Sequence, residues 1–243
     1  MILRRVHPAA PAEGAVLDVD GAGARERLLK WYAPGEGESI RLNFVTTLDG
    51  RVTGEDGTSG SLTAGADRMI LGVIREHADV ILVGASTVRA ESYRLPRRTP
   101  LAIVTSSGDL SGHEFEPRED APDVLVLAPG SATDAVRRSL RGIRHTILPL
   151  PDRSEPATAL EILGALRAHG AERMVCEGGP GLAGRLLAAG LVDEVCLTTV
   201  PRLGGSGISL LPDDDGAITR WAPRQLLLDG DGVHYARWAR RVD

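Results

Sequence analysis

The sequence predicts an α/β fold with a mostly parallel central sheet that is flanked by helices and ends in an antiparallel hairpin. From residue 40 to residue 200, short apolar runs alternate with amphipathic stretches, an order typical of parallel sheets. Two final apolar runs, 225–228 and 234–238, enclose the residues Asp-Gly-Asp-Gly, which is a hairpin signal. The 243 residues, 42% of them hydrophobic, suffice for one sizeable core, and no second core is evident.

The first part of the chain, residues 1–38, is rich in Ala, Gly and Pro and contains one predicted helix, 22–32. We treat it as an N-terminal extension that precedes one domain of residues 39–243. That domain starts with an alternating strand and an amphipathic helix, followed by an apolar and therefore buried strand, a short helix and a second buried strand. In chain order these elements are 40–48, 64–77, 80–84, a helix that starts at Ser86, and 101–105.

The alternation then continues to residue 200. Each further strand is a short apolar run, and each further helix repeats apolar residues three or four positions apart. The predicted strands are 124–127, 146–148, 173–176 and 194–200, and the predicted helices are 133–140, 156–169 and 182–189. Gly170 and Gly190 each fall just past a helix, where glycine commonly ends it.

Composition excludes several classes of protein. A net charge of -5, with 28 basic residues scattered among 33 acids, predicts no nucleic-acid partner. No apolar run approaches the roughly 20 residues that span a bilayer, and the first residues lack a signal-peptide core, so we expect no membrane partner and a cytoplasmic location. Cys176 and Cys196 lie in apolar runs without histidine at ligand spacing, so we expect buried free thiols and no metal.

The most informative segment is the glycine turn of residues 176–181 (Cys-Glu-Gly-Gly-Pro-Gly), which lies between a predicted strand and a predicted helix. Glycines let a backbone approach a bulky anion, and the first free N–H groups of a helix favour negative charge. The segment therefore predicts a site for a dinucleotide pyrophosphate. The alternative is an ordinary strand-to-helix turn that needs glycine for its geometry.

Polar residues follow two other predicted strands. Strand 40–48 leads into Asp49, and ligands of open α/β sheets bind beyond the carboxyl ends of strands, so Thr47 and Asp49 should face a ligand. A plain turn at Asp49-Gly50 is the alternative. Strand 80–84 leads into Ser86 and Thr87, which can cap a helix, hold a cofactor phosphate, or do both.

Two further candidates have equally ordinary alternatives. Ser106 and Ser107 end a predicted strand, where their hydroxyls can bind a ribose 2′-phosphate or simply form a common Ser-Ser-Gly loop. Arg75 has apolar neighbours on its predicted helix. Its guanidinium can grip a substrate phosphate with two N–H groups, or it can form a surface salt bridge.

Five motifs, in their order over residues 40–240, resemble the reductase half of the bacterial riboflavin-biosynthesis deaminase-reductase. They are Asn43 with Thr47-Leu48-Asp49-Gly50, Val83-Gly84 with Thr87-Val88, Glu177-Gly178-Gly179-Pro180, Gly190-Leu191-Val192-Asp193-Glu194, and Pro201 with Gly204. The resemblance implies a dihydrofolate-reductase-like fold, a homodimer and NADPH as the hydride donor. It also implies reduction, at C1′, of the ribosyl chain of a phosphorylated aminopyrimidine to a ribityl chain.

The resemblance further implies which residues bind each ligand. The residues implied for NADPH are Thr46, Ser61, Gly84, Thr87, Glu91, Ser106 or Ser107, Gly178, Gly179, Pro180, Gly181 and Leu182. The residues implied for the substrate are Asn43, Ser59, Arg75, Leu95, Arg98 and Glu177, the last as an acceptor for pyrimidine N–H groups. Asp49 should lie near the nicotinamide, and either Asp49 or Glu177 is the candidate catalytic acid that opens the ribosylamine to an imine.

The chain departs from the family pattern at three points. Residues 90–94 (Ala-Glu-Ser-Tyr-Arg) replace an Asp-Asp-Pro-like segment, so Glu91 and Tyr93 alter the substrate wall. The phosphate-binding arginine is left open among Arg94, Arg97 and Arg98. Neither His-x-Glu nor Pro-Cys-x-x-Cys occurs, so we expect a reductase alone. Either a separate deaminase supplies its substrate, or the family scaffold serves another pathway.

Two alternative functions stay open. A dihydrofolate or dihydropterin reductase would share the fold and the cofactor, but it needs an acid on the first long helix and an aromatic wall. Only Asp67 is available on that helix, in a chain with 3% aromatic residues. A catalytically silent NADPH-binding protein on the same scaffold is the other alternative, against which Asp49 and Glu177 argue.

Overall fold

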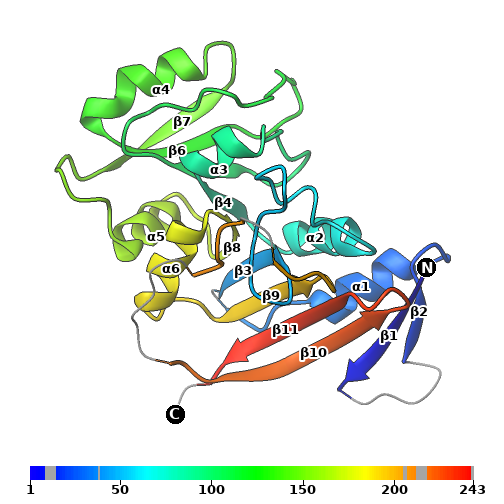
Figure 1. The fold of residues 1–243 in the computed structure, drawn as a ribbon. Coiled ribbons are helices and arrows are strands. Elements are labelled where there is room, and N and C mark those ends of the chain that lie inside the picture. The colour runs from blue at the N-terminus through cyan, green and yellow to red at the C-terminus, as the bar shows by residue number, and fades with distance from the viewer. Residues whose placement is uncertain (9–14, 38, 205–206, 212–217, 242–243) are drawn as a thin grey trace.

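The computed structural model describes residues 1–8, 15–37, 39–204, 207–211 and 218–241. Within these residues, eleven strands form one sheet in the order β2-β1-β10-β11-β9-β3-β8-β4-β5-β6-β7. Figure 1 shows the blue N-terminal strands at one end of this sheet and the green strands β6 and β7 at the other. The predicted α/β fold is confirmed.

The strands of the α/β alternation are parallel to one another. They are β3 (Ser39–Thr46), β4 (Val80–Gly84), β5 (Leu101–Val104), β6 (Val124–Pro129), β7 (His145–Leu150), β8 (Arg173–Gly178) and β9 (Glu194–Thr199). Because β3, β8 and β4 are neighbours, their carboxyl ends lie side by side at one edge of the sheet. This edge is where open α/β sheets bind ligands.

The antiparallel part of the sheet contains the predicted C-terminal hairpin, formed by β10 (Trp221–Asp229) and β11 (His234–Arg240). β11 joins the hairpin to β9, and β10 pairs on its other side with β1 (Ile2–His7), which pairs with β2 (Val16–Asp18). The sequence does not predict β1 or β2. Strand β2 has only three residues, and β1 interrupts its apolar residues with two arginines, so neither has a clear alternating pattern.

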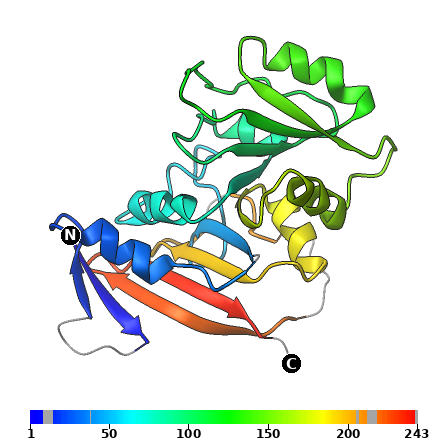
Figure 2. The same ribbon diagram turned by 180° about the vertical axis from the view of Figure 1, so that it is seen from behind.

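Helices cover both faces of the sheet, as Figures 1 and 2 show. One face holds α1 (Ala24–Tyr32), α2 (Asp67–Glu76), α3 (Ala85–Ala90) and α4 (Thr133–Ser139), which follows the short 3-10 helix η2 (Gly130–Ala132). The other face holds α5 (Ala159–Ala168) and α6 (Pro180–Ala188). Each face therefore has its own apolar core.

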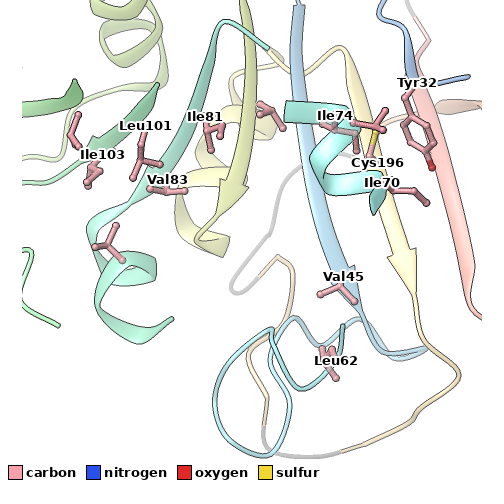
Figure 3. Close-up of a cluster of buried hydrophobic side chains, with 14 of the residues drawn as sticks. Tyr32, Val45, Leu62, Ile70, Ile74, Ile81, Val83, Leu101, Ile103 and Cys196 are labelled. Carbon is pink, nitrogen blue, oxygen red and sulfur yellow. The ribbon is translucent and has the colours of Figure 1, made fainter. Parts of the chain in front are cut away.

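Strand β4 shows how one sheet serves two cores. Ile81 and Val83 pack on the side of α2 and α3, whereas Val80 and Leu82 pack on the side of α5 and α6. Successive residues of a strand point to opposite faces, so an unbroken apolar run marks a strand buried on both faces. Figure 3 shows Ile81 and Val83 near Leu101 of the adjacent strand β5. The strands that carry the pocket described below are thus fixed by packing from both sides.

The helix α2 begins at Asp67, three residues later than predicted. The preceding residues form a turn, because the backbone N–H of Ala66 donates a hydrogen bond of 2.8 Å to the hydroxyl of Tyr235. Tyr235 in turn donates to Asp229 Oδ2 at 2.8 Å. These contacts with the C-terminal hairpin fix the place where Asp67 enters the helix.

The structure also describes the two cysteines and the length of the helices. Cys176 and Cys196 are buried free thiols, as predicted, and burial raises the pKa of Cys176 to about 12. In the described part of the chain, no helix is long and apolar enough to cross a membrane.

Candidate active site

A pocket of about 580 Å³ lies at the carboxyl ends of β3, β4 and β8, with α2 and the segment that includes α3 as its walls. It brings together many of the residues that the sequence singles out. Those among its lining are Asn43, Ser59, Arg75, Thr87, Glu91, Glu177, Gly178, Gly179 and Pro180. Some of the residues implied for the substrate and some of those implied for the cofactor therefore line one pocket.

The glycine turn presses against the start of α3. Gly178 has φ 145°, which an L side chain rarely adopts, and the Gly178–Gly179 peptide bond is cis. A Cβ at Gly179 would lie 2.9 Å from Thr87 Oγ1, closer than real Cβ atoms approach. Pro180 then occupies the first turn of α6, where its missing N–H is harmless. The turn needs both glycines for local geometry and also leaves its backbone open to the pocket.

Glu177 is the centre of a buried hydrogen-bonded cluster. Arg75 donates to it twice, from Nε to Oε1 at 2.7 Å and from Nη2 to Oε2 at 2.6 Å. The hydroxyl of Tyr93 donates to Oε2 at 2.7 Å and accepts from Arg75 Nη2 at 2.8 Å. The side chain of Glu177 is only 6% exposed. The carboxylate is thus anchored from α2 and from the segment after α3.

Burial and charge set the protonation of this cluster. Burial acts to lower the pKa of Arg75, but the negative charge and hydrogen bonds of Glu177 outweigh it and raise that pKa, so the guanidinium stays charged. Burial, with the charge of Glu177 as the next cause, raises the pKa of Tyr93 well above its usual value. Tyr93 therefore remains a neutral donor to the carboxylate.

Asp67 also lines the pocket, at the first residue of α2. Its Oδ1 accepts a hydrogen bond of 2.6 Å from Thr198 Oγ1 on β9. Burial raises the pKa of Asp67, and the hydrogen bond from Thr198 only partly offsets this effect. A carboxyl that holds its proton more tightly than usual thus faces the same space as Glu177.

Ser59 and Glu91, implied for substrate and cofactor respectively, bind each other. Glu91 Oε1 accepts from the Ser59 backbone N–H at 2.8 Å, and Oε2 accepts from its hydroxyl at 3.1 Å. The bond pair ties the loop before α2 to the end of α3. Ser61, two residues on, does not line the pocket and donates to Asp56 Oδ1 at 2.7 Å instead.

Asp49 does not line this pocket, and neither does Thr47. The Asp49 carboxylate accepts from Thr47 Oγ1 at 2.7 Å and from the Gly204 N–H at 3.3 Å, and the Thr47 bond is the largest cause of its lowered pKa. The Gly50 N–H donates to the Thr47 carbonyl at 3.0 Å. Asp49 therefore forms the turn that the sequence offered as the alternative to a ligand contact.

Other implied cofactor and substrate residues also lie outside the pocket lining. Thr46 is buried in β3, and the side chain of Leu182 packs in the core beneath α6. Gly84 ends β4 and Gly181 lies in the first turn of α6. Leu95 lines a separate hollow beside Arg118.

The candidate phosphate-binding arginines separate into two places. Arg94 lines the pocket, but its guanidinium is bound to Glu114 Oε2 at 2.7 Å. Arg98 lies in an adjoining hollow of about 380 Å³ that shares Arg75 with the pocket. Among the described residues that line this hollow, one carboxylate faces four guanidinium groups, those of Arg25, Arg75, Arg97 and Arg98. The hollow is the more basic of the two places.

Ser106 and Ser107 are exposed on the loop after β5, outside the pocket lining but at the same edge of the sheet. Arg89 of α3 reaches this loop and donates to the Asp109 carbonyl at 2.7 Å. No sequence motif points to Arg89, because Arg89 precedes the loop by about 20 positions and belongs to a different element. This contact brings a positive charge to the loop that carries the two serines.

Within the described residues, no group of three or more His, Cys, Asp or Glu side chains is arranged to hold a metal ion.

A family model described as the RibD C-terminal domain matches residues 38–235. The chain belongs to the RibD C-terminal domain family. The resemblance stated from the five motifs is thereby confirmed. This family membership covers the pocket and every strand of the parallel part of the sheet.

Two relatives illustrate the family. Riboflavin biosynthesis protein RibD of Corynebacterium ammoniagenes is 32% identical over 172 residues, which are 71% of this chain and 45% of the relative. The 2,5-diamino-6-ribosylamino-4(3H)-pyrimidinone 5′-phosphate reductase of Methanothermobacter thermautotrophicus is 30% identical over 187 residues, 73% of this chain and 84% of the relative. The chain thus spans about half the length of the RibD relative and most of the archaeal one.

The fold has solved counterparts. A pyrimidine reductase-like protein from Corynebacterium diphtheriae NCTC superposes with a TM-score of 0.67 at 24% identity, over 85% of this chain and 93% of that one. A deaminase/reductase from Thermotoga maritima superposes with a TM-score of 0.64 at 20% identity, over 85% of this chain and 57% of that one. At these identities the likeness concerns the fold, and it agrees with the fold that the resemblance implied.

Proposed function

We propose that the protein is an NADPH-dependent reductase that transfers a hydride to C1′ of a phosphorylated ribosylaminopyrimidine, such as 5-amino-6-(5-phosphoribosylamino)uracil. One observation carries the proposal: the Gly178-Gly179 turn and the anchored carboxylate of Glu177 line the same pocket. The first suits a pyrophosphate and the second suits a ring with N–H groups. Membership of the RibD C-terminal domain family supports this reaction class.

The glycine turn fits a nicotinamide dinucleotide. Any side chain at Gly179 would press on Thr87, so the turn keeps a bare backbone surface beside a hydroxyl. The nine-residue helix α6 follows directly and adds the positive end of its dipole. When bound, NADPH supplies the hydride, and the chain's own residues hold and orient the two partners.

The preference for NADPH over NADH rests on the far end of the dinucleotide. A ribose 2′-phosphate adds negative charge, which hydroxyls and a guanidinium can bind. Ser106 and Ser107 offer the hydroxyls, and the nearby Arg89 offers the charge that the sequence alone did not reveal. We assign the 2′-phosphate to this loop.

The substrate ring is assigned to Glu177. Its carboxylate is ion-paired with Arg75 and accepts three hydrogen bonds from Arg75 and Tyr93, which leaves about one of its four acceptor positions for a ring N–H group. Glu177 therefore orients the pyrimidine, and the proton for ring opening comes from elsewhere. The basic hollow that contains Arg98 and shares Arg75 is assigned to the phosphate.

A turnover assay tests the proposal. NADPH absorbance at 340 nm is followed with the purified protein and the phosphoribosylaminouracil made in situ by an added deaminase, with dihydrofolate and NADH in parallel. We expect turnover with the pyrimidine, slower turnover with NADH, and loss of pyrimidine turnover in Glu177→Gln with NADPH binding retained. Turnover with dihydrofolate alone would overturn the proposal.

One observation favours a second candidate, a dihydropterin-type reductase. Such an enzyme needs an acid on the first long helix, and Asp67 of α2 is buried in the pocket wall with a raised pKa. Phe44 and Tyr93 are the aromatic side chains that line the pocket among the described residues. The dihydrofolate arm of the assay separates this candidate from the first, while NADPH binding without either reaction would indicate a silent binding protein.

Three broader assignments complete the proposal. We propose a homodimer, on the strength of the family resemblance, and a cytoplasmic location, on the strength of the sequence composition; sedimentation velocity and cell fractionation test them. The division into an extension of residues 1–38 and a reductase domain of residues 39–243 is likewise proposed. The family match to residues 38–235 supports it, although the pairing of β1 with β10 makes the extension part of the same sheet.

A further inference from the structure

Asp67 is a buried acid in the pocket wall that has no role in the proposed pyrimidine reduction so far. The residue is 8% exposed, and its Oδ1 accepts the hydroxyl of Thr198 at 2.6 Å. Within the part of the chain that the structure describes, no donor binds its second oxygen, Oδ2. Asp67 thus has a fixed orientation and one oxygen that is available to a ligand.

The other acids of the pocket are already engaged. Glu177 is bound by Arg75 and Tyr93, and Glu114 is ion-paired with Arg94. Glu91 uses both oxygens to accept hydrogen bonds from one serine, Ser59. Asp67 differs from them because its partner is a single neutral hydroxyl and no cation binds it directly.

The surroundings of Asp67 favour its protonated form. Burial raises its pKa, and the negative charge of Glu177 on β8 adds to the rise, while Thr198 on β9 and the charge of Arg68 on its own helix oppose it. Tyr235 on β11 lies near enough for the charge of Asp67 to raise the tyrosine's own pKa. The nearby groups are thus one carboxylate, one arginine and two hydroxyls.

We propose that Asp67, held in position by Thr198, donates the proton that the reduction consumes. The inference rests on the proposed function and adds the acid that Glu177 and Asp49 do not provide. Glu177 is ion-paired with Arg75 and serves as an acceptor, and Asp49 forms a turn outside the pocket lining. Asp67 faces the pocket from the wall that also carries Arg75.

Opening of the ribosylamine ring is the step that needs the proton. When the C1′–O4′ bond of the ribosylamine breaks, the lone pair of the amine nitrogen forms the C1′=N bond, and O4′ takes the proton of Asp67. C1′ then accepts the hydride of the nicotinamide, and the C1′=N pair returns to nitrogen. Solvent reprotonates the Asp67 carboxylate, so each turnover uses one NADPH and one proton.

Single-turnover oxidation of NADPH over a pH series tests the role. In the wild-type protein the rate should fall as pH rises through the pKa of Asp67, because the acid form is required. Asp67→Asn should be slower by about 10²- to 10⁴-fold, the usual contribution of a general acid, and should lose this pH dependence. NADPH affinity, followed by its fluorescence, should stay the same.

Two control variants sharpen the test. Thr198→Val removes a hydrogen bond that lowers the pKa of Asp67, so the fall in rate should move to higher pH rather than vanish. Asp134→Asn, an exposed acid on α4, should behave as the wild type. A wild-type rate and pH profile in Asp67→Asn would overturn the proposal.

A direct titration separates this proposal from the proposed function. The ¹³C resonance of the Asp67 carboxyl, assigned by its loss in Asp67→Asn, should titrate above the ordinary aspartate value of about 3.9. A value at or below that would overturn the acid role whether or not the protein turns over. If the wild type titrates as expected but oxidises no NADPH with the pyrimidine, the proposed function fails while the protonated Asp67 stands.

Discussion

Glu177 depends on Arg75 and Tyr93, and the three side chains come from three different segments of the chain. A buried carboxylate is stable only when its charge and hydrogen-bonding capacity are satisfied. The cluster therefore links α2, the end of β8 and the segment after α3 into one wall of the pocket. Removing any one of its members affects the other two.

The first prediction concerns this cluster. Tyr93→Phe removes one hydrogen bond to a charged group and should lower the free energy of unfolding by about 1.5–3 kcal/mol. Arg75→Met leaves Glu177 buried without its cation and should lower it by about 3–5 kcal/mol. Urea unfolding measures both. The double variant Arg75→Met with Glu177→Leu should recover much of the loss, and a strictly additive loss would contradict the coupling.

The second prediction concerns pH and Asp67. Because the pKa of Asp67 is raised in the folded protein, the folded state binds the proton more tightly than the unfolded state. The contribution of Asp67 to stability is therefore fully present below its unfolded pKa of about 3.9 and is lost as pH rises through its folded pKa.

Asp67→Asn has no such titration. The free energy of unfolding of the variant, minus that of the wild type, should increase as pH rises from about 4 toward neutrality and then level off. Urea unfolding at a series of pH values gives this difference. A difference that stays constant or decreases over the series would show that the folded pKa is not raised.

The sequence motifs single out several residues that the structure brings to one pocket, and the ligand-binding roles of these residues stay predictions. Glu177, Gly178, Gly179 and Thr87 all reach the pocket. The pairing of Glu177 with Arg75 could not be predicted from the sequence, because about 100 positions separate the two residues. Each of them was also a candidate for binding the substrate by itself. Local turns were also hard to separate from ligand contacts, as Asp49 illustrates.

Among the elements, the turn between β8 and α6 is the one on which the cofactor assignment depends. The turn approaches α3 so closely that the side chain of Thr87 fills the space where a Cβ of Gly178 or Gly179 would lie. Backbone geometry and ligand access therefore make the same demand for glycine. The same backbone conformation therefore suits both interpretations of the segment, a plain turn and a phosphate-binding site.

The third prediction follows from that contact. Gly179→Ala should weaken NADPH binding at least tenfold and lower the free energy of unfolding by about 1–3 kcal/mol, because the added Cβ displaces Thr87. NADPH fluorescence titration and urea unfolding measure the two effects. Gly184→Ala on the same helix meets no atom within 4 Å and serves as the control, so equal losses in both variants would contradict the account.

The α/β alternation itself was predictable because the parallel strands are buried on both faces and read as unbroken apolar runs. β4, predicted as 80–84, has the same bounds in the structure. The ends of α5 were not predictable from periodicity alone. A capping box between Thr158 and Glu161 sets its start at Ala159, which is three residues later than the start of the predicted helix 156–169.

At the scale of the whole molecule, the extension of residues 1–38 completes the sheet. β1 covers the edge of β10, and Leu3 on β1 is fully buried. The helix α1 packs against α2, which carries Asp67 and Arg75. The extension thus supports the helix that forms one wall of the pocket.

The fourth prediction tests that integration. Leu3→Ala should lower the free energy of unfolding by about 2–5 kcal/mol, the usual loss for a buried leucine. The neighbouring Ile2 is 48% exposed, so Ile2→Ala should change stability far less. Both variants should unfold in a single transition followed by circular dichroism. A separate early transition in Leu3→Ala would show that the extension folds independently of the rest.

Transfer of deuterium from NADPH labelled at both C4 positions tests the central claim most directly. The protein is given the phosphoribosylaminouracil, and the product is analysed by mass spectrometry and NMR. We expect a ribitylamino product with one deuterium at C1′, formed by the wild type and lost in Glu177→Gln. Oxidation of NADPH that leaves no deuterium in the pyrimidine product, or deuterium found only in a reduced pterin, would contradict it.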